Sequence, residues 1–425
     1  MTRLVKYPLF ILGFLVECFS TYSPFPVFPP GEFFGVPKEP GLKEMRVVHG
    51  WRTVDFVFPS SSVRQALIRT GRFVPGNAII LDADFWQSGD EERIFVTLPK
   101  MRRGIPATLA TVSQHICLDG SPKLHPYPDW SWQGDNNCEG IVSAFRTKID
   151  ECGRLWVIDS GVTEILEDAN RDCPPKILVF DLDTDQLIMK YIFPQDVLEY
   201  GSLLVTIAVD NRLKHCRDTF AYVADVTTYG LIVFNSRTRS SWRVSSNYFY
   251  PFPLYGTLNV AGQEFDLMDG VIGLALSPIN KYGDRTLYFH SLASVREAKV
   301  SANLLRNESN FEDGHNYVSK KFYITDEVRE SQSVAQDMSK RGVLFFGLLS
   351  PVSVACWNSK LPYVPFNIVT IAQNNETLRF SSGVKVVRKN GVEELLVTSS
   401  RFSSYFLGNI DERDVNFRIF ERNRA

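Results

Sequence analysis

The sequence predicts an all-β protein, a six-bladed β-propeller, and the prediction rests on a repeated succession of short strands. Between residues 138 and 194, apolar runs rich in β-branched and aromatic residues end in Asp, Gly, Cys or Pro, as strands covered on both faces do. The same succession of runs returns about 65 residues later, between 204 and 244. Four short strands repeated at that period are typical of propeller blades.

Taken in order, the first half of the chain supplies a leader, one isolated strand and three blades. Residues 21–45 are rich in Pro, Gly and Phe without periodicity and are expected to form a leader across the surface. Residues 46–58 alternate as one strand, and 61–70 form a short helical stretch. The strands of the three blades are expected at 77–82, 93–98, 107–112 and 124–132, then at 140–150, 154–159, 176–181 and 186–193, and then at 204–210, 220–225, 230–235 and 241–244.

The second half supplies two complete blades and one that lacks a strand. The sixth blade needs a fourth strand, and the isolated strand at 46–58 provides it. The ring then closes by pairing the N-terminal strand with the last blade, which leaves no exposed edge and makes residues 46–425 one propeller. The strands of these blades are expected at 270–276, 285–290, 298–304 and 321–325, then at 333–336, 342–347, 352–356 and 367–371, and finally at 383–387, 394–398 and 415–420.

The composition excludes two classes of partner. The 425 residues include 46 Lys or Arg and 48 Asp or Glu, so the net charge is -2. This balance provides no basic field for nucleic acid or for an anionic membrane surface, and neither is expected as a partner. The chain also has 31 Phe, 16 Tyr and 7 Trp, enough for a large aromatic core.

The N-terminus indicates secretion. Residues 1–20 begin with positive charge, continue through a short apolar run and end in a polar stretch, which is the order of a signal peptide. We expect cleavage after Ser20 and a secreted, extracellular mature protein; a buried N-terminal strand is the alternative. In a secreted protein, Asn307 and Asn375 are glycosylation sites, because each begins an Asn-x-Ser/Thr sequence.

The cysteines indicate disulfide bonds. Loss of the signal peptide removes Cys18 and leaves an even number of cysteines, with no Cys-x-x-Cys pair typical of zinc sites. In the predicted blades, Cys117 and Cys152 lie on one face of the disc, and Cys138 and Cys173 lie on the other. We therefore predict the disulfides Cys117–Cys152 and Cys138–Cys173 and leave open whether Cys216 pairs with Cys356.

Ordered motifs along the chain resemble a known family. The longest are 126–132 (PYPDWSW), 150–161 (DECGRLWVIDSG), 269–278 (DGVIGLALSP) and 285–293 (RTLYFHSLA), and shorter ones occur at 138–143, 173–181, 221–225, 229–233, 355–358 and 415–419. Together they resemble the insect yellow and major royal jelly protein family over nearly everything after the leader. The resemblance implies a secreted six-bladed propeller, and it provides no catalytic residues to carry over.

The resemblance also implies functions. Yellow-like proteins are associated with cuticle and melanin pigmentation, and some members convert dopachrome. Related salivary members bind biogenic amines in the central cavity, and the royal jelly branch is nutritive and oligomeric. This chain has no repetitive low-complexity tail, which argues against the nutritive role.

Propellers bind ligands at one mouth of the central channel, and the ligand-binding residues are expected there. The loops that precede first strands, or that join second to third strands, form this mouth. A carboxylate facing an aromatic wall would suit a small aromatic amine or a catechol-derived ligand, through charge pairing and cation–π contact. The candidates are Glu139, Asp269, Gln332, Asp225, Trp132 and His290.

Each candidate also has an ordinary structural interpretation. An Asp at the end of a second strand, such as Asp159 or Asp225, commonly caps the following turn. Trp132 can pack between blades, and His290 can be a buried histidine with satisfied hydrogen bonds. The remaining three candidates precede or begin inner strands and are therefore the better channel residues.

Two function classes stay open, and a third is more distant. The chain lacks the nucleophile elbow, the His-Glu-x-x-His zinc motif, the phosphate loop and the dinucleotide fingerprint, and no cofactor is expected. A dopachrome isomerase needs only a placed acid/base pair and an oxyanion donor. A non-catalytic binder of amines or pigment precursors, or a cuticle-associated structural factor, is the alternative. A lactonase-like propeller would hold calcium on Glu139, Asp225, Asp269 and Asn358.

Overall fold

The computed structural model describes residues 45–134, 137–212, 216–311 and 318–423. The predicted signal peptide, and the predicted leader up to residue 44, lie outside the described residues. Within them, no helix has the length and apolar character that crossing a membrane requires.

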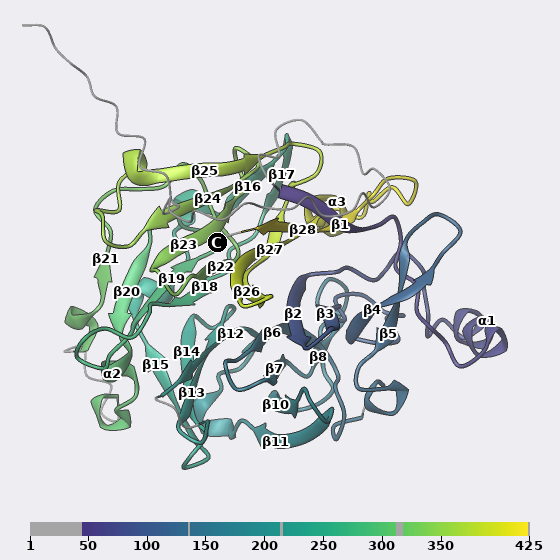
Figure 1. The fold of residues 1–425 in the computed structure, drawn as a ribbon, viewed down its shortest axis with the longest axis horizontal. Coiled ribbons are helices and arrows are strands. Elements are labelled where there is room, and N and C mark those ends of the chain that lie inside the picture. The colour runs from purple at the N-terminus through teal and green to yellow at the C-terminus, as the bar shows by residue number, and fades with distance from the viewer. Residues whose placement is uncertain (1–44, 135–136, 213–215, 312–317, 424–425) are drawn as a thin grey trace, which may run out of the picture.

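Six four-stranded antiparallel sheets surround one axis, as the sequence predicts (Figure 1). In five of them the first strand along the chain lies innermost; in the blade that contains the N-terminal strand, that strand lies outermost and the next one along the chain lies innermost. The blades are β2 (Asp82–Ser88), β3 (Glu91–Thr97), β4 (Leu109–Ile116) and β5 (Pro122–Pro126); β6 (Ala144–Ile149), β7 (Arg154–Asp159), β10 (Lys176–Asp181) and β11 (Gln186–Ile192); β12 (Leu204–Asn211), β13 (Thr219–Asp225), β14 (Gly230–Asn235) and β15 (Ser240–Ser245); β18 (Val271–Leu276), β19 (Thr286–Ser291), β20 (Ala298–Ser301) and β21 (Tyr323–Ile324); β22 (Gln336–Met338), β23 (Val343–Leu348), β24 (Ser353–Asn358) and β25 (Ile368–Gln373); and β26 (Ser381–Lys389), β27 (Val392–Ser400), β28 (Phe417–Asn423) and β1 (Met45–Trp51).

The innermost strands form a closed ring. Strand β2 contacts β6, and the contacts continue through β12, β18, β22 and β26 back to β2. Apolar side chains fill the space between neighbouring blades, including Trp156, Phe180 and Phe234, all fully buried. The ring therefore leaves a central channel lined by the side chains of six strands.

The N-terminal strand lies at the outer edge of the last blade. Strand β1 pairs antiparallel with β28 from Met45 opposite Arg422 to Trp51 opposite Phe417. Trp51 is fully buried, and its indole N–H donates to the carbonyl of Pro122 in the first blade at 2.6 Å. The strand ends at Trp51 and not at residue 58, because the following residues turn to the first blade, where Phe56 bridges Leu124.

The first inner strand differs from its prediction. The apolar run at 77–82 is buried core, and the inner strand is β2 (Asp82–Ser88). Asp82 and Asp84 alternate with Ala83 and Phe85 along this strand, so the two carboxylates share one face. The prediction was wrong here because it rests on apolar runs, whereas β2 presents the carboxylates of Asp82 and Asp84 to the channel.

Further elements lie outside the blades. Helix α1 (Ser61–Arg69) matches the predicted helical stretch and is capped by Ser60, whose hydroxyl accepts from the Val63 N–H. Unpredicted elements include the hairpin β16 (Thr257–Val260) and β17 (Gln263–Asp266), the pair β8 (Val162–Thr163) and β9 (Asn170–Arg171), α2 (Ala302–Leu305) and α3 (Phe402–Phe406). Short 3₁₀ helices are η1 (Trp130–Trp132), η2 (Gln195–Val197), η3 (Asn247–Phe249), η4 (Pro253–Tyr255), η5 (Glu308–Asn310), η6 (Val318–Lys321) and η7 (Pro365–Asn367).

Two disulfides between described residues join neighbouring parts of the propeller. The predicted Cys138–Cys173 bond is confirmed, with 5.4 Å between its Cα atoms. The predicted Cys117–Cys152 bond is wrong: Cys152 pairs with Cys216, and Cys117 is a free thiol. Cys152 and Cys216 both lie in connections between first and second strands, in adjacent blades, so they share a face and are closer neighbours than the prediction assumed.

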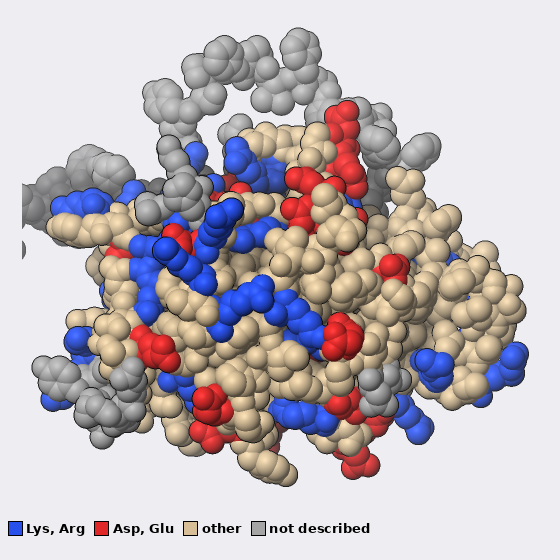
Figure 2. Space-filling model, turned by 90° about the horizontal axis from the view of Figure 1, so that it is seen from below, with Lys and Arg blue, Asp and Glu red and all other residues tan. Residues whose placement is uncertain are grey.

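The outer wall of the disc carries both signs of charge. In the view of Figure 2, basic and acidic side chains both occur, with wide uncharged areas between them. This agrees with the near-balanced composition.

Candidate functional site

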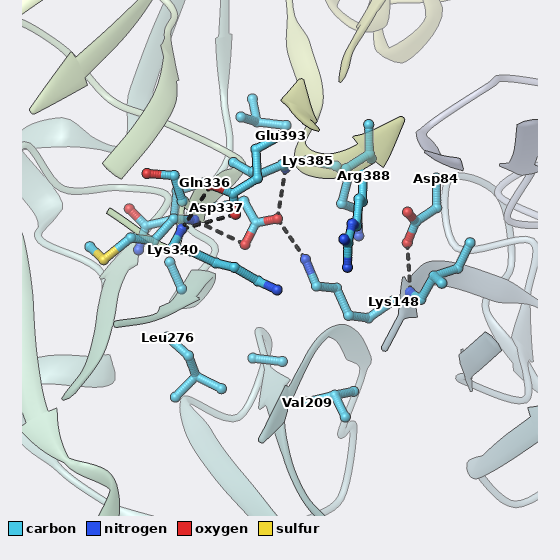
Figure 3. A pocket seen from close by; sticks show the side chains of 18 of the residues that line it. Asp84, Lys148, Val209, Leu276, Gln336, Asp337, Lys340, Lys385, Arg388 and Glu393 are labelled. Carbon is cyan, nitrogen blue, oxygen red and sulfur yellow. Dashed lines mark hydrogen bonds and ion pairs between the residues drawn. The ribbon is translucent and has the colours of Figure 1, made fainter. Parts of the chain in front are cut away.

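A cavity of about 1790 Å³ occupies the central channel. Its walls are the inner strands. Its rim is formed by turns that join first to second strands, at 150–153, 278–279, 339–341 and 391, together with the start of β27. The rim therefore lies at the opposite end of the channel from the mouth at which the candidates were sought. Figure 3 shows polar side chains converging from several inner strands into this space.

One part of the wall is a charged network built on alternate strand positions. Asp82 on β2 lies 3.0 Å from the Lys385 ammonium on β26 and 3.6 Å from the Arg146 guanidinium on β6. Both cations also donate to backbone carbonyls, Arg146 to Ser382 and Lys385 to Thr147. These bonds join three inner strands across the channel and compensate the buried charges.

Lys148 and Asp337 form a second pair in the cavity. The Lys148 ammonium lies 2.6 Å from the Asp337 carboxylate, which also accepts the Val386 N–H at 2.9 Å (Figure 3). Burial acts to lower the pKa of Lys148, but the nearby Asp337 and Asp84 carboxylates outweigh it and raise the pKa above its ordinary value. Lys148 is therefore a cation at neutral pH.

Asp84 is the cavity carboxyl with the most altered acidity. Its side chain accepts the Ile149 N–H at 2.8 Å and its neighbour's N–H, from Phe85, at 2.9 Å. No ion pair with Asp84 occurs among the described residues. Burial raises the pKa of Asp84 to about 6, against the opposing effect of Lys385 and Lys148. This carboxyl can therefore both release and accept a proton near neutral pH.

The facing part of the wall is mainly apolar. Strands β12 and β18 contribute Val209, Ile272, Leu274 and Leu276 to the cavity lining. Figure 3 shows Val209 and Leu276 on the side of the cavity away from Lys385 and Asp337. A flat aromatic ligand can lie between these two walls, with its ring against the apolar surface and its polar groups toward the charged network.

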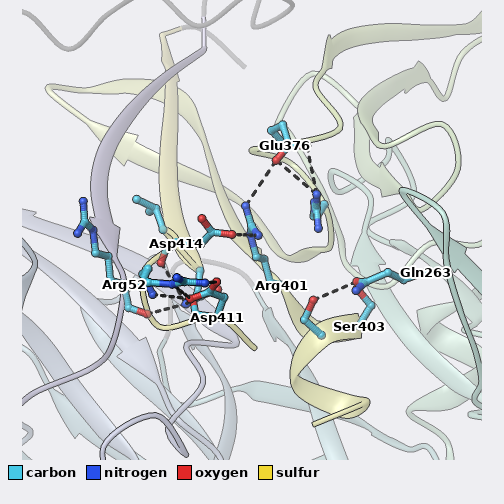
Figure 4. Close-up of polar contacts among 12 residues, drawn as sticks. Arg52, Gln263, Glu376, Arg401, Ser403, Asp411 and Asp414 are labelled. Atoms are coloured by element: carbon cyan, nitrogen blue, oxygen red, sulfur yellow. Dashed lines mark hydrogen bonds and ion pairs between the residues drawn. The ribbon is translucent and has the colours of Figure 1, made fainter. Parts of the chain in front are cut away.

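Part of the hydrophobic core lies at the beginnings of the inner strands. Apolar side chains of the β16–β17 hairpin and α3, including Phe265 and Phe402, share one core cluster with Val205 and Ile272, at the beginnings of inner strands. Figure 4 shows how the hairpin and helix are joined: the Ser403 hydroxyl donates to the Gln263 side-chain oxygen at 2.5 Å. The same view shows Arg401 paired with Asp414 and Glu376.

Asp225 and Asp159 are structural carboxylates. Asp225 is fully buried and lies 2.9 Å from the Arg243 guanidinium. Burial acts to raise the pKa of Asp225, but hydrogen bonds from Ser202 and Thr228 and the charge of Arg243 lower it below the ordinary value. Asp159 accepts the Gly161 N–H and pairs with Lys176 at 2.9 Å. Both carboxylates hold the turns that follow their strands.

Glu139 and Gln332 lie outside the cavity. Glu139 is exposed and forms an ion pair with Lys190 at 2.7 Å. Gln332 donates to the carbonyls of Tyr255 and Thr257, both at 3.1 Å, and so holds the start of the β16–β17 hairpin.

The other three candidates are enclosed by blade packing or loops. Trp132 packs edge-on against Phe180, with 5.2 Å between ring centroids. His290 is buried, and its Nδ1 lies 3.0 Å from Glu297; burial and the nearby Arg329 lower the pKa of His290 despite that carboxylate. Asp269 is half-buried, and burial raises its pKa to about 7.

None of the six candidate residues lines the cavity. The residues that line its charged wall are not among the predicted ones, because the prediction places ligand contacts in loops and strand residues in the core. The sequence does contain a signal: charged residues two apart, as in Asp82 and Asp84 or Arg146 and Lys148, next to apolar residues of the same strand. In a buried strand such a pair must face a channel or a partner of opposite charge.

A metal site has no support among the described residues. They contain no group of three or more His, Cys, Asp or Glu side chains arranged to hold an ion. Of the four residues suggested for calcium, Asp225 is bound to Arg243 and Glu139 to Lys190.

Asn307 and Asn375 are both exposed, so a glycan could be attached at either without disturbing the core.

Comparison with known proteins assigns the family. A family model described as Major royal jelly protein matches residues 142–425. The chain belongs to the major royal jelly protein family. Protein yellow of Drosophila melanogaster is 38% identical to this chain over 376 residues, which are 88% of this chain and 67% of that protein. Protein yellow of Drosophila erecta is 37% identical, with the same coverage of both chains. The resemblance to the yellow and royal jelly family is thereby confirmed.

Among solved structures, a streptogramin B lyase aligns with 81% of this family member and 94% of its own chain, at 10% identity and a TM-score of 0.41. This likeness is too weak to support any conclusion.

Proposed function

We propose that this yellow-family protein is secreted and serves melanin or cuticle pigmentation, and that its central cavity isomerises dopachrome. The similarity to Protein yellow supports the pigmentation role. The disulfides Cys138–Cys173 and Cys152–Cys216 support secretion, because such bonds persist in oxidising compartments. The observation that carries the enzymatic proposal is a cavity with a titratable carboxyl and a lysine on one wall and apolar side chains on the other.

The reaction is an internal rearrangement. Dopachrome is an indoline quinone that bears a carboxylate. Protons leave two adjacent ring carbons, and protons arrive at the two quinone oxygens, giving the dihydroxyindole carboxylate. No electrons leave the molecule, so the reaction needs proton transfer and charge stabilisation only.

Asp84 and Lys148 are the residues for these roles. The Asp84 carboxylate accepts a proton from a ring carbon, and its pKa of about 6 keeps it largely ionised at neutral pH but still basic enough to be protonated. Lys148 is cationic and stabilises the negative charge that develops on a quinone oxygen. The ring lies against Val209 and Leu276, which keeps water from one of its faces.

The experiment is the decay of dopachrome absorbance with purified protein, wild type against Asp84→Asn. Asn keeps the shape and can still accept the Ile149 N–H, but it cannot take up a proton. The expected loss of rate is on the order of a hundredfold, the usual contribution of a general base. Glu139→Gln is the matched control, because it also neutralises one carboxylate but lies outside the cavity.

The outcomes separate the possibilities. Saturable acceleration that is lost in Asp84→Asn and kept in Glu139→Gln supports the proposal. Decay no faster than with heat-inactivated protein would refute the enzymatic role. Equal loss in both variants would locate the chemistry elsewhere.

A second candidate function is binding without turnover, of a biogenic amine or a pigment precursor, or association with cuticle. The observation that favours it is the rigid character of the wall, where Asp82 and Asp337 are already bonded to Lys385, Arg146 and Lys148. Titration calorimetry with dopachrome analogues distinguishes this function, because it reports binding whether or not the ligand reacts.

A further inference from the structure

The cavity lining carries more positive than negative side chains. Among the described residues, eight cationic and six acidic side chains line it. The excess lies near the rim, on strand β26 and in the β22–β23 turn, which contribute Arg388 and Arg341. An anion that enters the cavity therefore meets a favourable field, and a cation does not.

Most of the acidic side chains in the lining are already engaged by cations. Asp82 and Asp337 have the partners described above, Asp150 lies 2.6 Å from Arg154, and Glu151 lies 3.1 Å from Lys340. Glu393 accepts the Lys340 backbone N–H through both oxygens. Asp84 is the remaining one, and burial makes its charged form costly. Among the described residues of the lining, Asp84 and Glu393 are therefore the carboxylates without a cationic partner, and an entering ammonium group would meet these two against the cations of the wall and rim.

Arg388 is in the opposite situation. Its side chain is exposed and makes no hydrogen bond or ion pair with the described residues. Its cross-strand partner is Glu393, whose carboxylate instead accepts the Lys340 backbone N–H. Figure 3 shows Arg388 beside the cavity, on the same strand as Lys385 and on the side of the charged network. A guanidinium in this position can bind a carboxylate through two parallel hydrogen bonds.

Two buried polar atoms point to a ligand that also donates hydrogen bonds. Gln336 and Thr206 line the cavity and are 6% and 8% exposed. The Gln336 side-chain oxygen and the Thr206 hydroxyl make no hydrogen bond within the described structure. The Gln336 amide group is fixed, because it donates to Glu297 and to the Tyr288 carbonyl, so its oxygen is an acceptor for a ring N–H or hydroxyl.

We infer that the cavity recognises a carboxylate-bearing aromatic molecule, not an aromatic amine, with Arg388 binding the ligand carboxylate at the rim. The ring extends inward between the Val209 and Leu276 surface and the charged network, with its N–H or hydroxyl at Gln336. This inference rests on the proposed use of the cavity and names its substrate class. Arg388 is the specificity-determining residue.

The test is equilibrium binding of three stable indoles, measured by titration calorimetry. Indole-2-carboxylate, indole and tryptamine share one ring system and are anionic, neutral and cationic. The proteins are wild type, Arg388→Gln and Arg72→Gln, which removes an exposed arginine outside the cavity. We expect the carboxylate to bind best and Arg388→Gln to weaken it about tenfold, the effect of losing one charge-assisted pair. Indole should bind Arg388→Gln as it binds wild type.

Other outcomes overturn the inference. Tryptamine binding as tightly as the carboxylate would refute the preference for anions. Arg388→Gln weakening all three ligands equally, or none, would remove Arg388 from recognition. Both results are independent of dopachrome turnover, so a protein that binds the carboxylate but does not accelerate dopachrome decay would refute the proposed reaction and keep the inference.

Discussion

The Asp84→Asn substitution should stabilise the protein at neutral pH while removing activity. Asp84 is 3% exposed, and burial raises its pKa from 3.8 to about 6. A raised carboxyl pKa means that the folded protein binds this proton more tightly than the unfolded chain does. The contribution to stability is complete below the unfolded pKa and is lost as pH rises through about 6.

The size of this stabilisation follows from the shift in the pKa of Asp84. About two pKa units correspond to roughly 3 kcal/mol, because each unit is worth about 1.4 kcal/mol. At neutral pH the wild type bears this cost of keeping a buried carboxylate ionised, and the neutral Asn side chain avoids it. For a propeller of this size, the unfolding entropy per residue converts roughly 3 kcal/mol into a rise in Tm of about 4 °C.

The assay is thermal unfolding of wild type and Asp84→Asn, near pH 7.5 and near pH 4. We expect the variant to be more stable near pH 7.5 and nearly equal to wild type near pH 4, where Asp84 is protonated. Asp90→Asn, at an exposed turn, is the control and should change neither value. A variant that is less stable than wild type near pH 7.5 would refute the argument that burial dominates at Asp84.

Two further predictions concern stability. Cys216→Ser breaks the bond to Cys152, which spans 64 residues, and should lower the free energy of unfolding by about 2 to 4 kcal/mol in denaturant titrations. Cys117→Ser, which removes a free thiol, is the control and should leave that free energy unchanged. Equal denaturation midpoints for wild type and Cys216→Ser would contradict this disulfide. Arg243→Met leaves the buried Asp225 carboxylate without its cation and should cost about 3 to 5 kcal/mol by the same measurement. A cost near zero would show that the hydroxyl donors alone compensate that charge.

The blade plan could be predicted from sequence because each strand is a short run with its own turn residues. Strands β18 (Val271–Leu276) and β23 (Val343–Leu348) begin within one residue of their predicted positions. The pairing of β1 with β28 followed from counting, since one blade lacked a strand and one strand lacked a blade. The β16–β17 hairpin was missed because its strands are four residues each and carry little periodicity.

The site could not be located in the same way. Which end of a propeller channel is open depends on how elements outside the blades pack, and residues that pack together there, such as Phe265 and Phe402, are far apart in the sequence. The network of Asp82, Arg146 and Lys385 joins strands from three blades. Only the closed ring brings them together, although their alternating spacing within each strand is visible beforehand.

The most direct test of the account is the pH dependence of dopachrome decay from about pH 4.5 to about pH 8, for wild type and Asp84→Asn. If Asp84 is the base, the wild-type rate should rise with pH through a midpoint near 6 and then level off, and the variant should be slow throughout. A wild-type rate that stays constant across this range, or a variant that keeps the same rise, would contradict the assignment of the cavity carboxyl as the catalytic group.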